Sequence, residues 1–233
     1  MTAQSGSAVV DPGVCLAVSA EASILDPVHA RIEAYYTDRI SHHGVGPRGV
    51  DWTCTATQEL RFVQLLKLCD FGRPFSLNDV GCGYGALVDF VARHFQKTEI
   101  DYLGLDLSPA MISRARRRNR GRQGCRFLVG CEIPRIADYV VASGVMNVML
   151  DHPRLLWEEF VADTLRRMHA SSRLGFAVNF MAEKPDGTTK GLYRVDPSHW
   201  TLFCQQTLGC RVEVVEGYGM REYTLLVRPR HEP

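Results

Sequence analysis

The sequence predicts an α/β fold in which a mostly parallel β-sheet is covered by helices on both faces. From about residue 75 onwards, short apolar runs typical of strands alternate with stretches of helical periodicity, as in consecutive βαβ units. A glycine-rich segment directly follows the first apolar run, as at many strand-to-helix turns. Two final apolar runs are joined by a short turn-like segment, which predicts a terminal hairpin and an antiparallel edge.

Five strands are expected ahead of the hairpin. They are Ser76–Val80, Tyr102–Asp106, Arg126–Val129, Tyr139–Ala142 and Leu174–Phe180, and the hairpin comprises Arg211–Val215 and Tyr223–Val227. A helix is expected over 86–95. A second helix begins at Pro109, because Ser108 is a favoured N-cap and proline is favoured at the first helical position. A third starts at Pro153, after which apolar residues recur at near-helical spacing as far as Met168.

The region ahead of the sheet divides into two parts. Residues 1–25 are rich in Ala, Ser and Gly and show little periodicity, which predicts a flexible N-terminus. Residues 26–74 are expected to form a helical cap, and residues 75–233 the α/β domain. Within the cap, the glycine-rich block 42–52 predicts a loop that closes over a site.

The composition argues against several classes of function. The 27 Lys and Arg residues are balanced by 26 Asp and Glu residues, so no global field attracts nucleic acid or an anionic membrane. No run approaches the roughly 18 apolar residues of a membrane span, and the start lacks the basic region of a secretory signal. A cytoplasmic protein is therefore expected. The eight cysteines contain no C-x-x-C pair, which predicts reduced, mostly buried thiols.

The most specific signal is the segment Asp79–Gly85, which reads D-V-G-C-G-Y-G. Glycines at such a position let a ligand approach the backbone closely. Asp106 ends the second expected strand about 20 residues further on, where a carboxylate can accept hydrogen bonds from both hydroxyls of a ribose. The loop differs from the G-x-G-x-x-G pattern that frames a pyrophosphate, and the acid at Asp79 suits a ligand that carries an ammonium group.

On these residues the chain resembles the class I S-adenosylmethionine-dependent methyltransferases. Their first motif matches Asp79–Gly85, and their second matches Leu103–Ser108. The resemblance runs from about residue 75 to the C-terminus. It implies a seven-stranded sheet with a terminal antiparallel strand, and S-adenosylmethionine as the cofactor that is converted to S-adenosylhomocysteine. A nicotinamide dehydrogenase or a non-catalytic Rossmann domain stays as an alternative.

Carried over by position, the resemblance implies a cofactor site along the strand ends. Gly81 and Gly83 would meet the methionine end of the cofactor and Asp106 its ribose. Leu107 and Met111 would pack near the adenine.

Further cofactor contacts are expected at three places. Ser143, followed by Gly144, ends the fourth strand and should lie beside the transferable methyl group. In the family the third strand commonly ends in an acid that meets the adenine amine, whereas here Cys131 and Glu132 share that position. In the cap, Arg61 is expected to bond the cofactor carboxylate, with a surface ion pair as the alternative.

The expected methyl acceptor is a small molecule. Methyltransferases for nucleobase or amide nitrogens resemble one another in an Asn/Asp-Pro-Pro-aromatic motif after the fourth strand, and here that place reads Ser143–Asn147 without it. The basic run Arg114–Arg122 is able to grip RNA phosphates, but it is also typical of a solvated helix face. An RNA methyltransferase and a non-catalytic S-adenosylmethionine-binding protein therefore remain alternatives. The oligomeric state and the methylated atom (O, N or C) stay open.

Six side chains are candidates for binding the acceptor and for its chemistry. Substrate contacts are expected from Tyr36, Trp52, Asn147 and Asn179, and proton removal from His152 or His43. A general base is needed for a hydroxyl or a carbon acceptor but not for an unprotonated nitrogen. The sequence contains no metal-ligand set, so metal-independent transfer is predicted.

Overall fold

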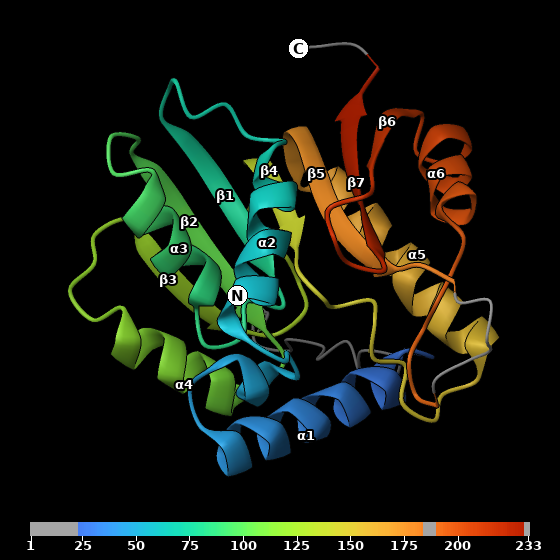
Figure 1. Ribbon diagram of the computed structural model, residues 1–233, viewed down its shortest axis with the longest axis horizontal. Coiled ribbons are helices and arrows are strands. Elements are labelled where there is room, and N and C mark those ends of the chain that lie inside the picture. The colour runs from blue at the N-terminus through green and yellow to red at the C-terminus, as the bar shows by residue number, and fades with distance from the viewer. Residues whose placement is uncertain (1–22, 184–189, 231–233) are drawn as a thin grey trace, which may run out of the picture.

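The computed structural model describes residues 23–183 and 190–230. Within them, seven strands form one sheet in the order β3-β2-β1-β4-β5-β7-β6 (Figure 1). The strands are β1 Phe75–Val80, β2 Ile100–Asp106, β3 Cys125–Val129, β4 Ala137–Ala142, β5 Ser172–Met181, β6 Cys210–Val215 and β7 Glu222–Pro229. Only β7 runs against its neighbours, β5 and β6. This arrangement confirms the predicted fold class.

The antiparallel strand is not the outermost one. β7 lies between β5 and β6, and the hairpin therefore places β6 at the edge. β7 is buried on both faces because Leu225 and Val227 pack into one core cluster while Leu226 packs into the other. A strand with two apolar faces is stable only in the interior of a sheet.

Helices cover both faces of the sheet, as predicted (Figure 1). One layer contains α2 (Thr55–Leu66), α3 (Ala86–His94) and α4 (Pro109–Arg118), and the other contains α5 (Arg154–Ala170) and α6 (Pro197–Gln206). α4 begins as the sequence indicates, because the Ser108 hydroxyl accepts a hydrogen bond from the Met111 N–H at 3.2 Å.

The N-terminal helix α1 (Asp26–His43) crosses the carboxyl ends of the strands (Figure 1). Its Thr37 hydroxyl shares a 2.7 Å hydrogen bond with Ser108, directly after β2. A short 3-10 helix, η1 (Pro47–Val50), then leads into α2. The predicted flexible segment 1–25 lies outside the described residues up to residue 22, and Leu25 is buried in the core.

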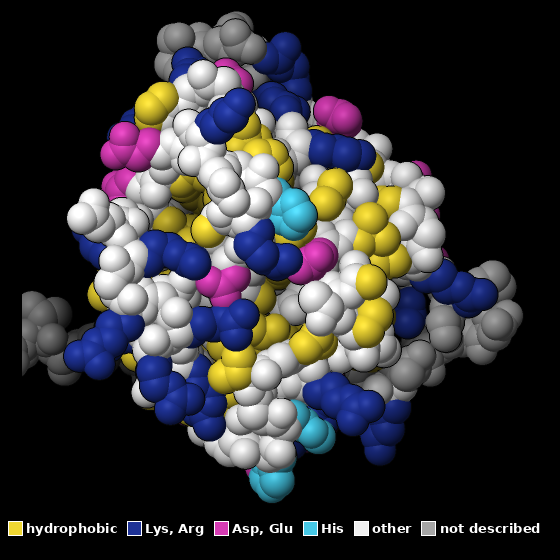
Figure 2. All heavy atoms as spheres, turned by 60° about the vertical axis from the view of Figure 1, so that its left-hand side comes forward, with side chains coloured by type: hydrophobic (Ala, Val, Ile, Leu, Met, Phe, Trp, Pro, Cys, Tyr) yellow, Lys and Arg dark blue, Asp and Glu magenta, His cyan; other side chains and the backbone are white. Residues whose placement is uncertain are grey.

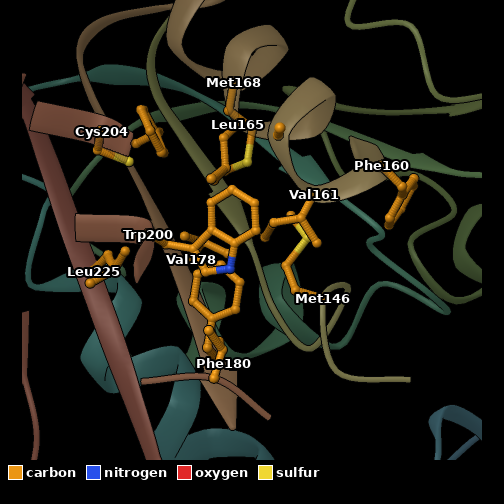
Figure 3. Close-up of a cluster of buried hydrophobic side chains, with 14 of the residues drawn as sticks. Met146, Phe160, Val161, Leu165, Met168, Val178, Phe180, Trp200, Cys204 and Leu225 are labelled. Atoms are coloured by element: carbon orange, nitrogen blue, oxygen red, sulfur yellow. The ribbon is translucent and has the colours of Figure 1, made fainter. Parts of the chain in front are cut away.

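The larger core cluster lies between the sheet and the layer of α5 and α6. Figure 3 shows Trp200 of α6 among residues of β5 and α5, including Val178 and Leu165. Its indole is stacked on Phe180 with ring centroids 6.1 Å apart, and the indole N–H donates to the Tyr193 hydroxyl at 3.2 Å. Trp200 therefore joins α6 to the sheet by packing and by a satisfied polar group.

No helix in the described ranges is long and apolar enough to cross a membrane. The seven cysteines that the structure describes are all free thiols.

Trp200→Ala is expected to lower the free energy of unfolding by about 3–5 kcal/mol, since it leaves a large cavity in the core. Leu202→Ala is the matched control on the same helix, because Leu202 is 48% exposed and surface truncations usually change stability by less than about 0.5 kcal/mol. Chemical denaturation measures both. Equal losses in the two variants would contradict the assignment of α6 to this core.

Candidate active site

The glycine-rich loop passes from β1 into α3 at the carboxyl edge of the sheet. Gly81, Gly83 and Gly85 adopt φ values of 70°, 55° and 81°, a region that favours glycine. A Cβ atom added at Gly81 would overlap the side chain of Val145, which follows β4. Because glycine has no side chain, the loop lies close to the neighbouring strand end and its backbone is open to the cavity.

Asp106, at the end of β2, fixes the position of this loop. One carboxylate oxygen accepts the Gly83 N–H and the other accepts the Ser108 N–H, both at 2.9 Å. Burial raises the pKa of Asp106 to about 6, against the opposing effect of these two hydrogen bonds. The carboxylate faces the cavity with lone pairs left for a ligand.

Asp79, the last residue but one of β1, is a second buried carboxyl group. It accepts a hydrogen bond from the Tyr102 hydroxyl at 2.5 Å. Burial raises its pKa to about 7, the Tyr102 hydrogen bond lowers it, and the neighbouring Asp106 raises it further. Two carboxyl groups beside each other at one strand edge suit a ligand that brings positive charge and hydroxyl donors.

A cavity of about 1130 Å³ opens beside these two groups. Its walls come from the strand ends, from α1 and from α5. Ten residues that the sequence singles out line it: Tyr36, Trp52, Asp79, Gly81, Gly83, Asp106, Leu107, Met111, Cys131 and Ser143. The Ser143 hydroxyl is buried and has no hydrogen-bond partner in the described structure, so it is available to a ligand.

Comparison with known proteins agrees with this geometry. A family model described as a methyltransferase domain matches residues 78–168. The chain is 38% identical to Rv1506c of Mycobacterium tuberculosis, a protein named as a methyltransferase, over 165 residues that make up 70% of this chain and 98% of that protein. The chain belongs to the class I S-adenosylmethionine-dependent methyltransferases.

Solved structures share the fold of this methyltransferase at low sequence identity. Magnesium protoporphyrin IX methyltransferase of Synechocystis matches 90% of this chain and 99% of its own, with 15% identity and a TM-score of 0.61. Human N-acetylserotonin methyltransferase matches 88% of this chain and 59% of its own, with 16% identity and a TM-score of 0.61. Mitomycin 7-O-methyltransferase matches 86% of this chain and 67% of its own, with 18% identity and a TM-score of 0.57.

Arg61 of the methyltransferase is absent from the residues that line the cavity. Its guanidinium forms a two-pronged buried ion pair with Glu222 of β7, in which Arg61 Nε lies 2.6 Å from Glu222 Oε2. The Trp52 ring covers the guanidinium at 3.6 Å and itself lines the cavity. The alternative of a surface ion pair is wrong in its location, because Arg61 is only 4% exposed and the pair is buried. The expected contact with the cofactor carboxylate stays a prediction.

The two candidate asparagines hold the backbone behind the cavity rather than line it. The Asn179 side chain accepts the Gly144 N–H at 2.8 Å and donates to Glu222 at 3.3 Å. Asn147 accepts the Met181 N–H at 3.1 Å. Both are buried side chains that order the carboxyl ends of β4 and β5, so neither is placed to contact an acceptor in this conformation.

The remaining candidates also lie away from the cavity wall. The His152 ring stacks on the Trp157 ring with centroids 6.3 Å apart, and the Nε2 atom of His152 is buried without a hydrogen-bond partner in the described structure. His43 is the exposed last residue of α1. Glu132 has an exposed side chain that pairs with Arg167, whereas its neighbour Cys131 does line the cavity.

Several cavity residues were missed in the sequence. His29, Ile32 and Glu33 join Tyr36 along one face of α1. These four residues are spaced three or four positions apart, so they lie on one face of the helix. The position of Tyr36 would have indicated the other three, once α1 was known to cross the site. Burial lowers the pKa of His29, and Arg167 adds to the effect.

We expect the stability of the ligand-free chain to fall between about pH 4 and pH 7 through Asp79. Its folded-state pKa is raised, so within this window the folded state holds more protons than the unfolded state and unfolding becomes easier as pH rises. Asp79→Asn removes this term, which for one proton is at most about 1.4 kcal/mol per pH unit. Denaturation at several pH values, read as wild type minus variant, measures it. A difference that does not change with pH would refute the raised pKa.

Proposed function

We propose that this methyltransferase transfers the methyl group of S-adenosylmethionine to a small, largely apolar molecule bound beneath α1. The observation that carries the proposal is the cavity beside Asp79 and Asp106. The cavity extends from the glycine-rich loop and Asp106 to α1 and α5, so the strand ends can take the cofactor while the helices cover an acceptor. Tyr36, Trp52 and Phe160 give it aromatic walls.

The cavity residues fit the cofactor. Asp106 would accept hydrogen bonds from the ribose hydroxyls, and Asp79 would pair with the ammonium group of the methionine moiety. Gly81 and Gly83 leave the loop backbone accessible, while Leu107 and Met111 supply apolar surface for the adenine. The sulfonium of the bound cofactor supplies an activated methyl group.

The solved structures support a small acceptor. Magnesium protoporphyrin IX, N-acetylserotonin and mitomycin are named as the substrates of three proteins that share this fold. Each is a small molecule and not a nucleic acid or a protein.

The arginine run also supports a small acceptor rather than RNA. Arg118 and Arg122 pair with Asp89, and the Arg116 guanidinium donates twice to the Phe127 carbonyl of the edge strand β3. Figure 2 shows that acidic side chains lie among the basic ones on the face that carries α4. These arginines are therefore used within the fold, and the face is not a continuous basic surface of the kind that grips a phosphate backbone.

Catalysis in this cavity relies mainly on position. Holding the nucleophile in line with the methyl carbon and the sulfur contributes about 7–11 kcal/mol. Because His152 and His43 do not line the cavity, we propose transfer without a histidine base from either position.

Cell extract incubated with the enzyme and isotopically labelled S-adenosylmethionine tests the function. Mass spectrometry should find the label in a small molecule and not in RNA. Label in RNA would favour the nucleic acid alternative. Tight cofactor binding with no label in any acceptor pool would favour a non-catalytic binding protein.

Asp106→Asn should weaken S-adenosylmethionine binding by about 10- to 100-fold, because a carboxylate makes charge-assisted hydrogen bonds of roughly 1.5–3 kcal/mol. Asp101→Asn, an exposed carboxylate on the same strand that pairs with Arg135, is the matched control and should bind normally. Calorimetric titration measures both. An unchanged dissociation constant for Asp106→Asn would remove Asp106 from the site.

His152→Ala and His43→Ala should each change the rate of methyl transfer by less than about threefold once an acceptor is known. A general base contributes about 10²–10⁴-fold, so the measurement separates the two cases clearly. A loss in that range, with cofactor affinity and thermal stability unchanged, would restore the histidine concerned as the base.

A further inference from the structure

Trp52 is an aromatic residue of the cavity wall with one of its two ring faces occupied. The Arg61 Cζ atom lies 3.6 Å from the centre of the ring, so the guanidinium stacks on that face. Arg61 is 4% exposed and does not line the cavity, whereas Trp52 does. The ring therefore lies between the guanidinium and the cavity, and its second face is the one that the cavity can reach.

This second face has no aromatic partner within the protein. Phe160, another aromatic residue of the cavity wall, already contacts the rings of His29 and Trp157, with centroids 5.7 Å and 4.8 Å away. In the described part of the chain no aromatic ring packs on Trp52. Trp52 thus differs from Phe160 in that it keeps a ring face for a ligand.

The edge of the Trp52 ring is seated on the end of β4. Gly144 adopts a φ of 79°, and a Cβ atom added there would overlap the six-membered part of the indole. Glycine is therefore needed both for the backbone conformation and for the space. The preceding residue, Ser143, lines the cavity and has a buried hydroxyl without a partner in the described structure. A ligand that pairs with this hydroxyl lies beside the indole.

The backbone of the loop that carries Trp52 is held in place before any ligand arrives. Asp51 has a φ of 64°, a strained value for a residue other than glycine, which persists only where the surroundings enforce it. Its carboxylate accepts hydrogen bonds from the Tyr35 hydroxyl at 2.7 Å and from the Arg39 guanidinium at 2.6 Å. The loop is thus fastened to α1 while the ring is fastened to α2, and the indole is presented at a fixed place.

The adenine of the cofactor is not the partner of this ring. We place the adenine beside Leu107 and Met111, which follow β2. Trp52 meets the end of β4, and β1 lies between β2 and β4 in the sheet. Two strand spacings, about 10 Å, therefore separate the two places.

We propose that Trp52 is the stacking platform for the methyl acceptor, and that the acceptor is a planar, conjugated molecule. A flat ring stacks with an offset on the free face of the indole, whereas a puckered saturated ring meets that face with few of its atoms. Arg61 acts through Trp52 and is a positioning residue. This assignment rests on the proposed function, whose acceptor it narrows to one class.

Two probes isolate the contribution of planarity. 1-Naphthol and decahydro-1-naphthol share a carbon skeleton and a hydroxyl, but the first is flat and aromatic and the second is saturated and puckered. Both are titrated calorimetrically into the full chain saturated with S-adenosylhomocysteine, so that the adenine site is already filled. The ratio of their dissociation constants reports the preference for a flat ring, and a loss of stability that weakens both probes equally cancels.

The wild-type chain should bind 1-naphthol more tightly than decahydro-1-naphthol. Trp52→Leu should reduce this preference by about 2- to 10-fold, the range of an aromatic contact beyond its buried area. Trp52→Phe should recover part of it, because a smaller ring remains. Phe160→Leu makes the same kind of change elsewhere on the cavity wall and should leave the preference unchanged, because the Phe160 ring is engaged by His29 and Trp157.

Gly144→Ala tests the seat of the ring without removing the indole. The added methyl group overlaps the edge of Trp52, so the ring must leave its place and the preference for 1-naphthol should fall. The strain that alanine meets at this φ weakens both probes alike and does not enter the ratio.

The labelled cell extract tests the class of acceptor directly. The product that carries the labelled methyl group should absorb in the near ultraviolet, as conjugated rings do. Label in a saturated molecule would overturn the planar class and leave methyl transfer to a small molecule in place.

Two further results would overturn the assignment. The first is a loaded wild-type chain that binds 1-naphthol no more tightly than decahydro-1-naphthol. The second is a Trp52→Leu variant that keeps the preference, and if that variant loses affinity for S-adenosylhomocysteine, the ring belongs to the cofactor site. Failure of the wild-type chain to bind S-adenosylhomocysteine would instead refute the proposed function itself.

Discussion

The buried ion pair between Arg61 and Glu222 connects the parts of this protein that make up the site. The two residues are 161 positions apart, on α2 and on β7. Glu222 continues the connection through Asn179 to the Gly144 N–H at the end of β4, and Arg61 continues it through the Trp52 ring. A Cβ atom at Gly144 would overlap that ring. The connection thus runs from Trp52 to Gly144, and both of these residues line the cavity.

Burying two charges costs free energy, and removing only one of the two partners destabilises the protein further. Removing one partner of a buried pair typically destabilises a protein by about 3–5 kcal/mol, because the other charge stays without water. The pair therefore holds α2 tightly against β5 and β7. It also fixes Trp52 at one distance from the strand ends, so the shape of the cavity depends on residues that do not line it.

The cavity makes negative charge costly before a ligand arrives. Asp79 and Asp106 are adjacent carboxyl groups whose pKa values are raised by burial to about 7 and about 6. A ligand that brings an ammonium group, a sulfonium and ribose hydroxyls relieves this cost, since it supplies both charge and hydrogen-bond donors. The same desolvation that destabilises the empty site thus favours occupation by a cationic nucleoside.

The sequence by itself determined the features that contiguous residues encode. Asp79–Gly85 and Asp106 marked the edge of the sheet at which the cavity lies, because a strand, its turn and the next helix are set by neighbouring positions. Tyr36 and Trp52 were also located at the cavity from the sequence.

Only the tertiary structure decided which distant groups meet. The sequence could not show that Arg61 is neutralised by a glutamate on the last strand, or that His152 packs beside Trp157 outside the cavity. It could not show either that Gln58 takes a place on the cavity wall. Local patterns specify where a helix forms and which of its faces is apolar, but the partner of a buried polar group is chosen by packing between segments far apart in the chain.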